Sequence, residues 1–347
     1  MTFWDFSRSP ASICRLLDFG RTRGLAPATL LSGTKLTLAQ LENAEIQVTP
    51  GQELGVIGNL LRLRPEGTGM GLQLGLTYHL SVHGVLGLGL MSSATPLDAL
   101  LWGHRFLSLS YTYARITYGI EGDVVTIRFE QPPALAEDLQ AFVVERAIGA
   151  VSCIVRDVAG TIAPISTIKL RASEPNGGVQ AELRKQLGLQ PRWEAGEDAM
   201  VLSLRALQCP SPQANATTAA MCQRMCEELV ESRRTKLGTV TLVQEFLASA
   251  PDDRTPKLAD VAALLCASER TVKRWLQDEG VSFRDLRQAS RLAKANHLLA
   301  SPSYSLTEVA ARLSFSDLSS FSQAYRRWTG TAPSASPLRK SSHIGRR

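Results

Sequence analysis

Two stretches near the end of the chain, LADVAALLCASERTVKRWLQDEG (258–280) and LTEVAARLSFSDLSSFSQAYRRWTG (306–330), repeat one pattern. In each, an L-x-[DE]-V-A-x-x-L segment predicts a short helix, a turn reaches a serine, and a second amphipathic helix follows. Ala262 and Ala310 are small enough to let that second helix cross closely, as a helix-turn-helix requires. The repeat, offset by 48 residues, therefore predicts a helical domain with two such motifs.

One predicted helix, FRDLRQASRLAKANHLLA (283–300), connects the two units. We expect its leucines to face the core and Arg287, Arg291 and Lys294 to face outward. A helix of this length spans about 27 Å. It can hold two recognition helices about one DNA turn, ~34 Å, apart on one face of a duplex.

The second helix of each unit is the candidate recognition helix. In 315–333 we expect Phe321, Tyr325 and Trp328 to pack inward and Ser316 or Asp317 to cap the helix start. Short polar side chains fit between base edges, whereas Arg and Lys suit guanine or phosphate. The candidate DNA-binding residues are Ser268, Arg270, Thr271, Lys273, Arg274, Leu318, Ser319, Ser320, Ser322 and Gln323.

Positive charge is concentrated in the same region. Residues 250–347 carry 16 Lys and Arg against 9 Asp and Glu, whereas 1–249 are close to neutral. A basic last third on a neutral body indicates a polyanion-binding module. A solvated charged face is the alternative.

The first two thirds predict a mixed fold. Segments 11–31 and 50–63 are amphipathic helices. The glycines of 67–90 fit neither G-x-G-x-x-G nor a P-loop, so we expect them to pack between helices. The alternation in 107–130 around Glu121-Gly122-Asp123 predicts a β-hairpin.

A long helix at about 134–157 and two further strands, ISTIKLRAS and MVLSLRAL, follow the hairpin. The predicted fold class is an α+β N-terminal sensor or dimerisation domain, followed by an all-α domain with two helix-turn-helix motifs joined by a linker helix.

The last third resembles the AraC/XylS family of bacterial transcription regulators, through SERTVKRWLQDEGVSFRDL (268–286) and FSDLSSFSQAYRRWTGTAP (315–333). The family usually has Arg where Gln323 stands, and an aromatic-Arg pair where this chain has Ser334-Ala335-Ser336-Pro337. These departures concern the base preference of the second recognition helix.

The N-terminal part resembles the arabinose-binding-like domain of a subgroup of that family, through LLSGTKLTLAQLENAEIQVTPGQELGVIGNLLRL and YHLSVHGVLGLGLMSSATPLDAL. Members respond to different small molecules, so the label implies no sugar. The resemblance implies double-stranded DNA, a small-molecule effector, RNA polymerase and a second copy of the chain as partners, and leaves activation and repression open.

We therefore predict an effector and dimerisation domain (1–208), a linker and connecting helix (209–235), a DNA-binding domain (236–337) and a basic tail (338–347). The predicted function is a sequence-specific transcription regulator controlled by an effector. A second hypothesis is that the N-terminal domain only dimerises. A third, an enzyme fused to the same module as in alkylation-response proteins, would require a cysteine motif that Cys209-Pro210-Ser211 does not provide.

Tyr111, Tyr113 and Arg115 alternate in the predicted hairpin, so we expect them to share a strand face and to be candidate effector ligands, with a solvated sheet face as the alternative. His79, His83 and His104 could line a pocket, but ordinary hydrogen-bonded histidines are the favoured interpretation. The six cysteines lack zinc spacing, and Cys222 and Cys226, on one helix face, are interpreted as free thiols. No catalytic residue, metal or cofactor is predicted.

No window of the chain is long and apolar enough to predict a membrane span. Asp5 precedes any apolar run near the start, which argues against a signal peptide. A cytoplasmic location is the resulting expectation.

Overall fold

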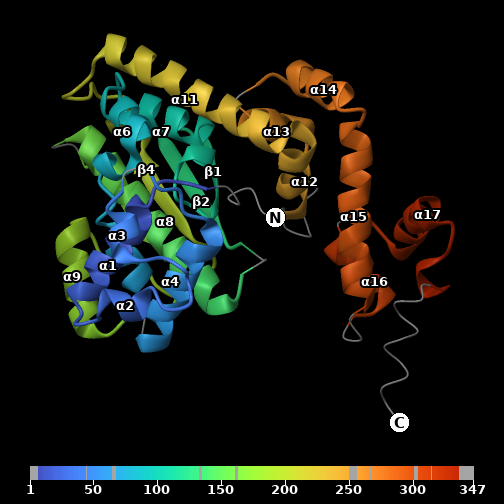
Figure 1. Ribbon diagram of the computed structural model, residues 1–347, viewed down its shortest axis with the longest axis horizontal. Coiled ribbons are helices and arrows are strands. Elements are labelled where there is room, and N and C mark those ends of the chain that lie inside the picture. Colours follow the sequence, from blue (N-terminus) through green and yellow to red (C-terminus); the bar gives the residue numbers. More distant parts are fainter. Residues whose placement is uncertain are drawn as a thin grey trace. The chain divides into compact units, whose positions relative to one another are not determined.

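The computed structural model divides the chain into an N-terminal unit that ends at Val230 and a C-terminal unit that begins at Glu231 (Figure 1). It describes residues 7–43, 45–64, 68–132, 135–160, 163–249, 256–265, 267–300, 304–313 and 315–335. The predicted basic tail, 338–347, and Cys266 lie outside these residues. Within the described ranges, no helix is both long and apolar enough to cross a membrane.

A four-stranded antiparallel sheet lies in the N-terminal unit, with strand order β1-β2-β4-β3. The strands are β1 (Arg115–Glu121), β2 (Val124–Glu130), β3 (Ile165–Lys169) and β4 (Ala199–Ser203). Glu121 pairs with Val124, and Gly122 in the tight turn has a φ of 59°, which glycine adopts without strain. The predicted hairpin is therefore confirmed.

The hairpin is shorter than the sequence predicts. Strand β1 begins at Arg115, not near 107, and residues Leu107–Leu109 form the short 3-10 helix η2. Arg115 pairs with Glu130, the last residue of β2, and Pro132 follows closely. Since a proline lacks the backbone N–H that a ladder needs, residues before Arg115 have no partner strand.

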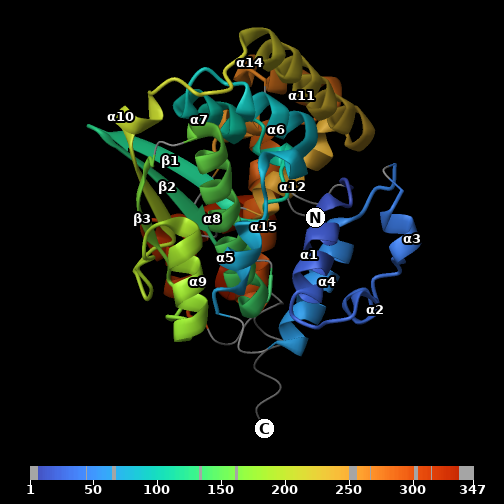
Figure 2. The same cartoon turned by 90° about the vertical axis from the view of Figure 1, so that its left-hand side faces the viewer.

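The sheet lies at one side of the unit, and the helices lie mostly on the other side of it (Figure 2). They are α1 (Ala11–Arg21), α2 (Pro27–Leu30), α3 (Leu38–Leu41), α4 (Pro50–Leu63), α5 (Met70–Gly75), η1 (Leu80–His83), α6 (Gly84–Met91), α7 (Pro96–Arg105), α8 (Glu137–Ala159), α9 (Gly177–Leu187), α10 (Leu204–Leu207) and α11 (Ala216–Leu237). The predicted long helix is α8, which packs on β2 and shares a core with the inward side chains Val125, Ile127 and Phe129.

Helices α5 and α8 approach each other unusually closely because glycines line their contact. A Cβ added to Gly71 would overlap the backbone oxygen of Phe142, and one added to Gly75 would overlap that of Arg146. From the other side, a Cβ on Gly149 would overlap the backbone oxygen of Leu72. The expectation that the glycine-rich segment packs between helices is confirmed.

The C-terminal unit is helical throughout its described residues. Its helices are α12 (Thr239–Ser249), α13 (Leu258–Leu264), α14 (Glu269–Asp278), α15 (Phe283–Ala300), α16 (Leu306–Arg312) and α17 (Leu318–Thr329), followed by the 3-10 turn η3 (Pro333–Ala335). Helices α13 and α14 form the first predicted motif and α16 and α17 the second, with α15 as the connecting helix (Figure 1).

Each motif has its own hydrophobic core. The first core contains Val261, Val272 and Leu276, and the second contains Val309 and Phe321 among its buried members. The two alanines of the repeated pattern are also buried. Both motifs therefore pack as the repeat predicts.

One residue of the connecting helix differs from its prediction. The Arg291 side chain does not face outward: its Nη2 donates a hydrogen bond to the backbone oxygen of Leu313 at 3.0 Å, and its guanidinium lies 4.2 Å from the ring centroid of Phe315. Arg291 therefore ties α15 to the turn of the second motif. The helical repeat of 3.6 residues shows on which side of α15 a residue lies. It cannot show the hydrogen bond of Arg291, because the acceptor lies on another element.

The glycine contact yields a prediction about stability. Gly75→Ala should lower the free energy of unfolding by about 1–3 kcal/mol, since the new methyl group must push against the rigid backbone of α8. Gly58→Ala is the matched control, because Gly58 lies inside α4 and a Cβ there would meet nothing within 4 Å.

Gly58→Ala should be neutral or should stabilise by about 0.5–1 kcal/mol, because alanine favours a helix over glycine. Urea unfolding of both variants followed by circular dichroism measures the difference. Equal stabilities would show that α5 and α8 do not pack as closely as described.

Candidate functional site

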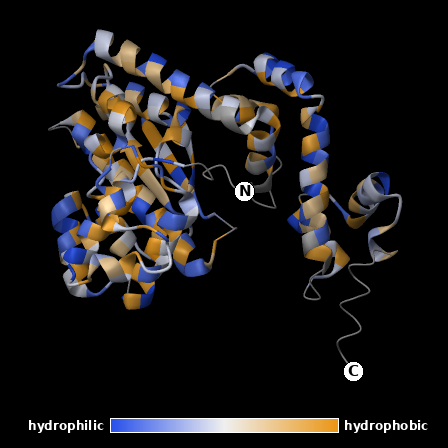
Figure 3. Ribbon diagram, in the orientation of Figure 1, coloured by the Kyte–Doolittle hydropathy of each residue, from blue (hydrophilic) through white to orange (hydrophobic). Residues whose placement is uncertain are grey.

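The first recognition helix, α14, exposes basic side chains. Ser268 caps it, because its Oγ accepts a hydrogen bond from the Thr271 backbone N–H at 3.1 Å. Val272 and Leu276 are buried on the inner face, while Arg270, Lys273 and Arg274 are exposed. Figure 3 shows α14 as a largely hydrophilic helix. Three cations on one outer surface can contact phosphates or guanine edges.

The second candidate recognition helix, α17, exposes uncharged side chains in its first half and two cations, Arg326 and Arg327, in its last turn. Asp317, not Ser316, caps it, with its Oδ1 accepting from the Ser320 backbone N–H at 2.7 Å. That hydrogen bond is the main reason why the pKa of the Asp317 carboxyl is lowered. Ser319 and Gln323 are exposed and Ser322 is half-buried, so these three can present hydroxyl and amide groups.

Leu318 and Ser320 are placed differently from the other candidates in α17. Leu318 is half-buried and packs against the second core, together with Trp328. The Ser320 hydroxyl donates to Asp317 Oδ2 at 3.1 Å. Both residues therefore have structural contacts besides any contact with DNA, and the assignment of DNA-binding residues stays a prediction.

The N-terminal unit contains an apolar cavity of about 110 Å³. It lies between α7, the start of β1 and the second half of α8. Most of its wall consists of aliphatic side chains, among them Leu86, Leu100, Val151 and Val155. The described residues that line it include no Asp or Glu.

Three aromatic rings meet at one end of this cavity. The ring centroids of Tyr78, His83 and Tyr111 lie 5.8–6.3 Å apart. Within the described part of the chain, neither ring nitrogen of His83 has a hydrogen-bond partner, although both are shielded from solvent. Burial lowers the pKa of His83 to about 4, so the imidazole is neutral at physiological pH.

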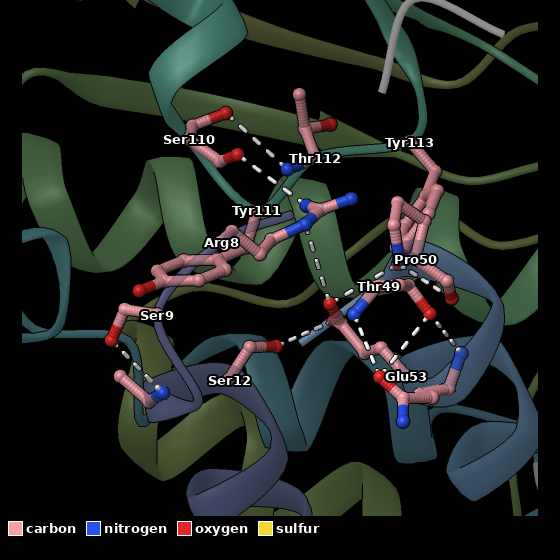
Figure 4. A network of polar contacts seen from close by, with 12 residues as sticks. Arg8, Ser9, Ser12, Thr49, Pro50, Glu53, Ser110, Tyr111, Thr112 and Tyr113 are labelled. Atoms are coloured by element: carbon pink, nitrogen blue, oxygen red, sulfur yellow. Dashed lines mark hydrogen bonds and ion pairs between the residues drawn. The ribbon is translucent and has the colours of Figure 1, made fainter. Parts of the chain in front are cut away.

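A buried ionic network supports that end of the cavity (Figure 4). The Glu53 carboxylate accepts hydrogen bonds from Arg146 Nη1 at 2.6 Å, from the Ser12 hydroxyl at 2.6 Å and from the Tyr113 hydroxyl at 3.1 Å, and Arg8 Nε lies 3.8 Å away. Burial alone would raise the pKa of Glu53, but the two arginines hold it below its ordinary value.

Arg146 itself is occupied by the protein. Its Nη1 is directed to Glu53, and its Nη2 donates to the backbone oxygen of Tyr111 at 2.9 Å. Burial would lower the pKa of Arg146, but Tyr78, the Glu53 carboxylate and Tyr113 raise it, so the guanidinium stays charged. The cavity wall therefore includes an arginine whose charge is paired with a carboxylate.

The three predicted effector ligands do not act as one surface. Tyr111 lines the cavity, Tyr113 is buried behind it against Glu53, and Arg115 at the start of β1 has its Nε 3.9 Å from Glu130 Oε2. The prediction that they share a strand face is wrong, because Tyr111 and Tyr113 precede β1. Local hydrogen bonds of Thr112 to Ser110 Oγ and Ala114 O shape this segment instead.

The histidines also separate. His83 and His104 line the cavity, whereas His79 lies outside it, with its Nδ1 3.0 Å from Asp157 Oδ2. The interpretation as a hydrogen-bonded histidine is wrong for His83. Neither Arg146 nor Glu53 was predicted from the sequence as a functional residue. Two charged residues, Glu145 and Arg146, interrupt the apolar run AFVVERAIGAV (141–151), and this could have indicated a buried ionic contact.

Comparison with known proteins identifies both units. Residues 24–211, more than half of the chain, match the family model described as the arabinose-binding domain of AraC transcription regulators. Residues 261–336 match a helix-turn-helix domain model.

Relatives of known name cover most of the chain. An uncharacterized HTH-type transcriptional regulator of Mycobacterium tuberculosis is 28% identical over 94% of this chain and 95% of its own length. The ornithine utilization regulator of Pseudomonas aeruginosa is 26% identical over 76% of this chain and 77% of its own. The crystal structure of the transcriptional regulator CdpR from Pseudomonas aeruginosa covers 93% of this chain and 96% of its own, with 24% identity and a TM-score of 0.47.

The exposed cations of α14 yield a prediction about DNA affinity. Lys273→Ala and Arg274→Ala should each weaken binding to a duplex that the full chain selects from a random pool. A lost base contact costs about 1–3 kcal/mol at one position, whereas a lost phosphate contact weakens all sequences and lowers the salt slope by about 1. Fluorescence anisotropy across a salt series measures both effects.

Lys185→Ala is the charge-matched control, because Lys185 is an exposed residue of α9 in the other unit. It should bind as tightly as the parent chain. Unchanged affinity of both α14 variants would refute the assignment of α14 as a recognition helix.

Proposed function

The chain belongs to the AraC transcription regulators with an arabinose-binding-type N-terminal domain, and on that premise we propose that a small effector bound in the N-terminal cavity controls it. It is a DNA-binding transcriptional regulator. The observation that carries the proposal is the pair of shielded His83 nitrogens at the end of an apolar cavity. A buried polar group without a partner is costly, and a ligand that hydrogen-bonds to it removes that cost.

The lining defines the class of effector. A cavity of about 150 Å³ can hold benzene, so a cavity of about 110 Å³ suits a smaller ligand, such as a short aliphatic chain. A cationic ligand would find no carboxylate among the described lining residues, and Glu53 already neutralises Arg146. A sugar would leave several hydroxyl groups against aliphatic walls. We therefore propose a small uncharged ligand with one hydrogen-bonding group.

Homodimerisation is the second part of the proposal, and an apolar stripe on α11 supports it. Met221, Met225 and Leu229 are spaced by four residues and are 43%, 41% and 49% exposed, whereas Cys222 and Cys226 on another face are buried. Apolar residues in a row along a helix can pack against the same row of a second copy.

The remaining parts of the proposal are the partner protein, the location, the DNA contacts and the domain bounds. We propose RNA polymerase as a partner, the cytoplasm as the location, and a role without catalysis, since the named relatives are transcriptional regulators. The proposed DNA contacts are those of the two recognition helices. The proposed domains are 1–208 and 236–337, joined by 209–235.

A thermal-shift assay tests the effector. 1-Butanol, n-pentane, butyrate and butylamine share a short aliphatic chain and differ in charge and hydrogen bonding. The alcohol should raise the melting temperature most, pentane less, and the two ions least, because binding to the folded state alone stabilises it. His83→Phe keeps a ring but removes both nitrogens, so it should erase the advantage of the alcohol over pentane.

The same assay separates the alternatives. If neither these probes nor a broad metabolite panel shifts the melting temperature, the N-terminal domain only dimerises. If the ions shift it most, the charge argument is wrong.

Sedimentation equilibrium tests the dimer. Met225→Glu should shift the chain towards monomer, because it places a charge in the stripe. Ala220→Glu is the matched control, since Ala220 is exposed on α11 but lies off the stripe, and it should sediment like the parent. A dimer that tolerates Met225→Glu uses another surface.

A further inference from the structure

Three potential metal ligands meet at one point beside α8. His79 lies in the loop before η1, and Cys153 and Asp157 lie four residues apart on α8, so they project from the same helix face. Their ligand atoms all lie within 4.8 Å of one another. None of the three residues lines the apolar cavity.

The separations match the edges of a zinc tetrahedron. His79 Nδ1 lies 3.0 Å from Asp157 Oδ2 and 3.3 Å from Cys153 Sγ, and that sulfur lies 3.9 Å from the same carboxylate oxygen. Usual Zn²⁺ bond lengths and tetrahedral angles give edges of about 3.4 Å for nitrogen to oxygen and about 3.6 Å for sulfur to either. Only small side-chain shifts would complete the geometry.

The arrangement does not suit a catalytic relay. In a nucleophile–histidine–acid triad, the nucleophile and the acid use different ring nitrogens. Here Cys153 and Asp157 both approach Nδ1 of His79, which is the convergence that a shared metal ion requires.

We propose that His79, Cys153 and Asp157 form a three-ligand Zn²⁺ site with its fourth position open to water. One nitrogen, one thiolate and one carboxylate suit Zn²⁺, whereas the sulfur disfavours Mg²⁺ and Ca²⁺. The His79 side chain is 60% exposed, which gives the ion a route from solvent. On binding, the Cys153 proton leaves to solvent and the thiolate takes its place on the metal.

Such a site would fix the loop that precedes η1 to α8. Tyr78 and His83, on either side of this loop segment, line the cavity, as do Ile154 and Val155 next to Cys153. A bound ion would therefore restrain two walls of the cavity at once. The metal site itself does not depend on an effector.

Metal titration of the full, chelator-treated chain tests the site. We expect one Zn²⁺ per chain in competition with a micromolar-affinity indicator, and release of about one proton per ion. Co²⁺ in place of Zn²⁺ should show tetrahedral ligand-field bands and thiolate-to-cobalt charge transfer. Zn²⁺ should also raise the melting temperature.

Variants assign the ligands. His79→Ala removes an exposed side chain and should weaken Zn²⁺ binding by more than about tenfold. Even residues that only hydrogen-bond to a metal ligand usually cost at least that much affinity when they are mutated, and His79 is proposed to bind the ion directly. Cys153→Ser should abolish the charge-transfer band, and Cys209→Ser, which replaces a half-buried free thiol elsewhere, should retain it. No binding by the parent chain, or equal binding by the parent and His79→Ala, would overturn the proposal.

Discussion

The buried carboxylate of Glu53 is the interaction on which the N-terminal unit depends. Glu53 lies on α4, and its carboxylate accepts hydrogen bonds from Arg146 of α8, Ser12 of α1 and Tyr113 of the segment before β1. Four segments distant in the sequence thus converge on one anion. A buried ion pair is stable only when every partner is present. The network also holds two of the rings at the end of the cavity, because the Tyr78 hydroxyl hydrogen-bonds with Ser12 and the Tyr111 backbone oxygen accepts from Arg146.

The two units were predictable to different degrees for a physical reason. The helix-turn-helix motifs depend on contacts within short windows: the cap at Ser268, the buried Ala262 and Ala310, and the helical spacing that buries Phe321. The sequence displays all of these directly. The prediction for Arg291 was wrong because its guanidinium donates to the backbone oxygen of Leu313, which belongs to another element.

The cavity could not be predicted in the same way. The contacts that support it join residues far apart in sequence, such as Glu53 with Arg146 and Arg146 with Tyr111. The alternation of Tyr111 and Tyr113 suggested a strand, but a strand needs a partner, and β2 ends opposite Arg115. β1 begins only at Arg115 because the chain opposite it reaches Pro132, which cannot continue the ladder. The residue pattern of the first strand does not show where its partner strand ends.

The separate cores of the two motifs have a consequence for evolution. Val272 and Leu276 pack in one core and Phe321 and Tyr325 in the other, so a substitution in one motif leaves the packing of the other intact. Energetic effects at sites without shared neighbours add independently. A lineage can therefore vary the exposed residues in the first half of α17, such as Ser319 and Gln323, while the packing that holds the exposed cations of α14 in place stays unchanged.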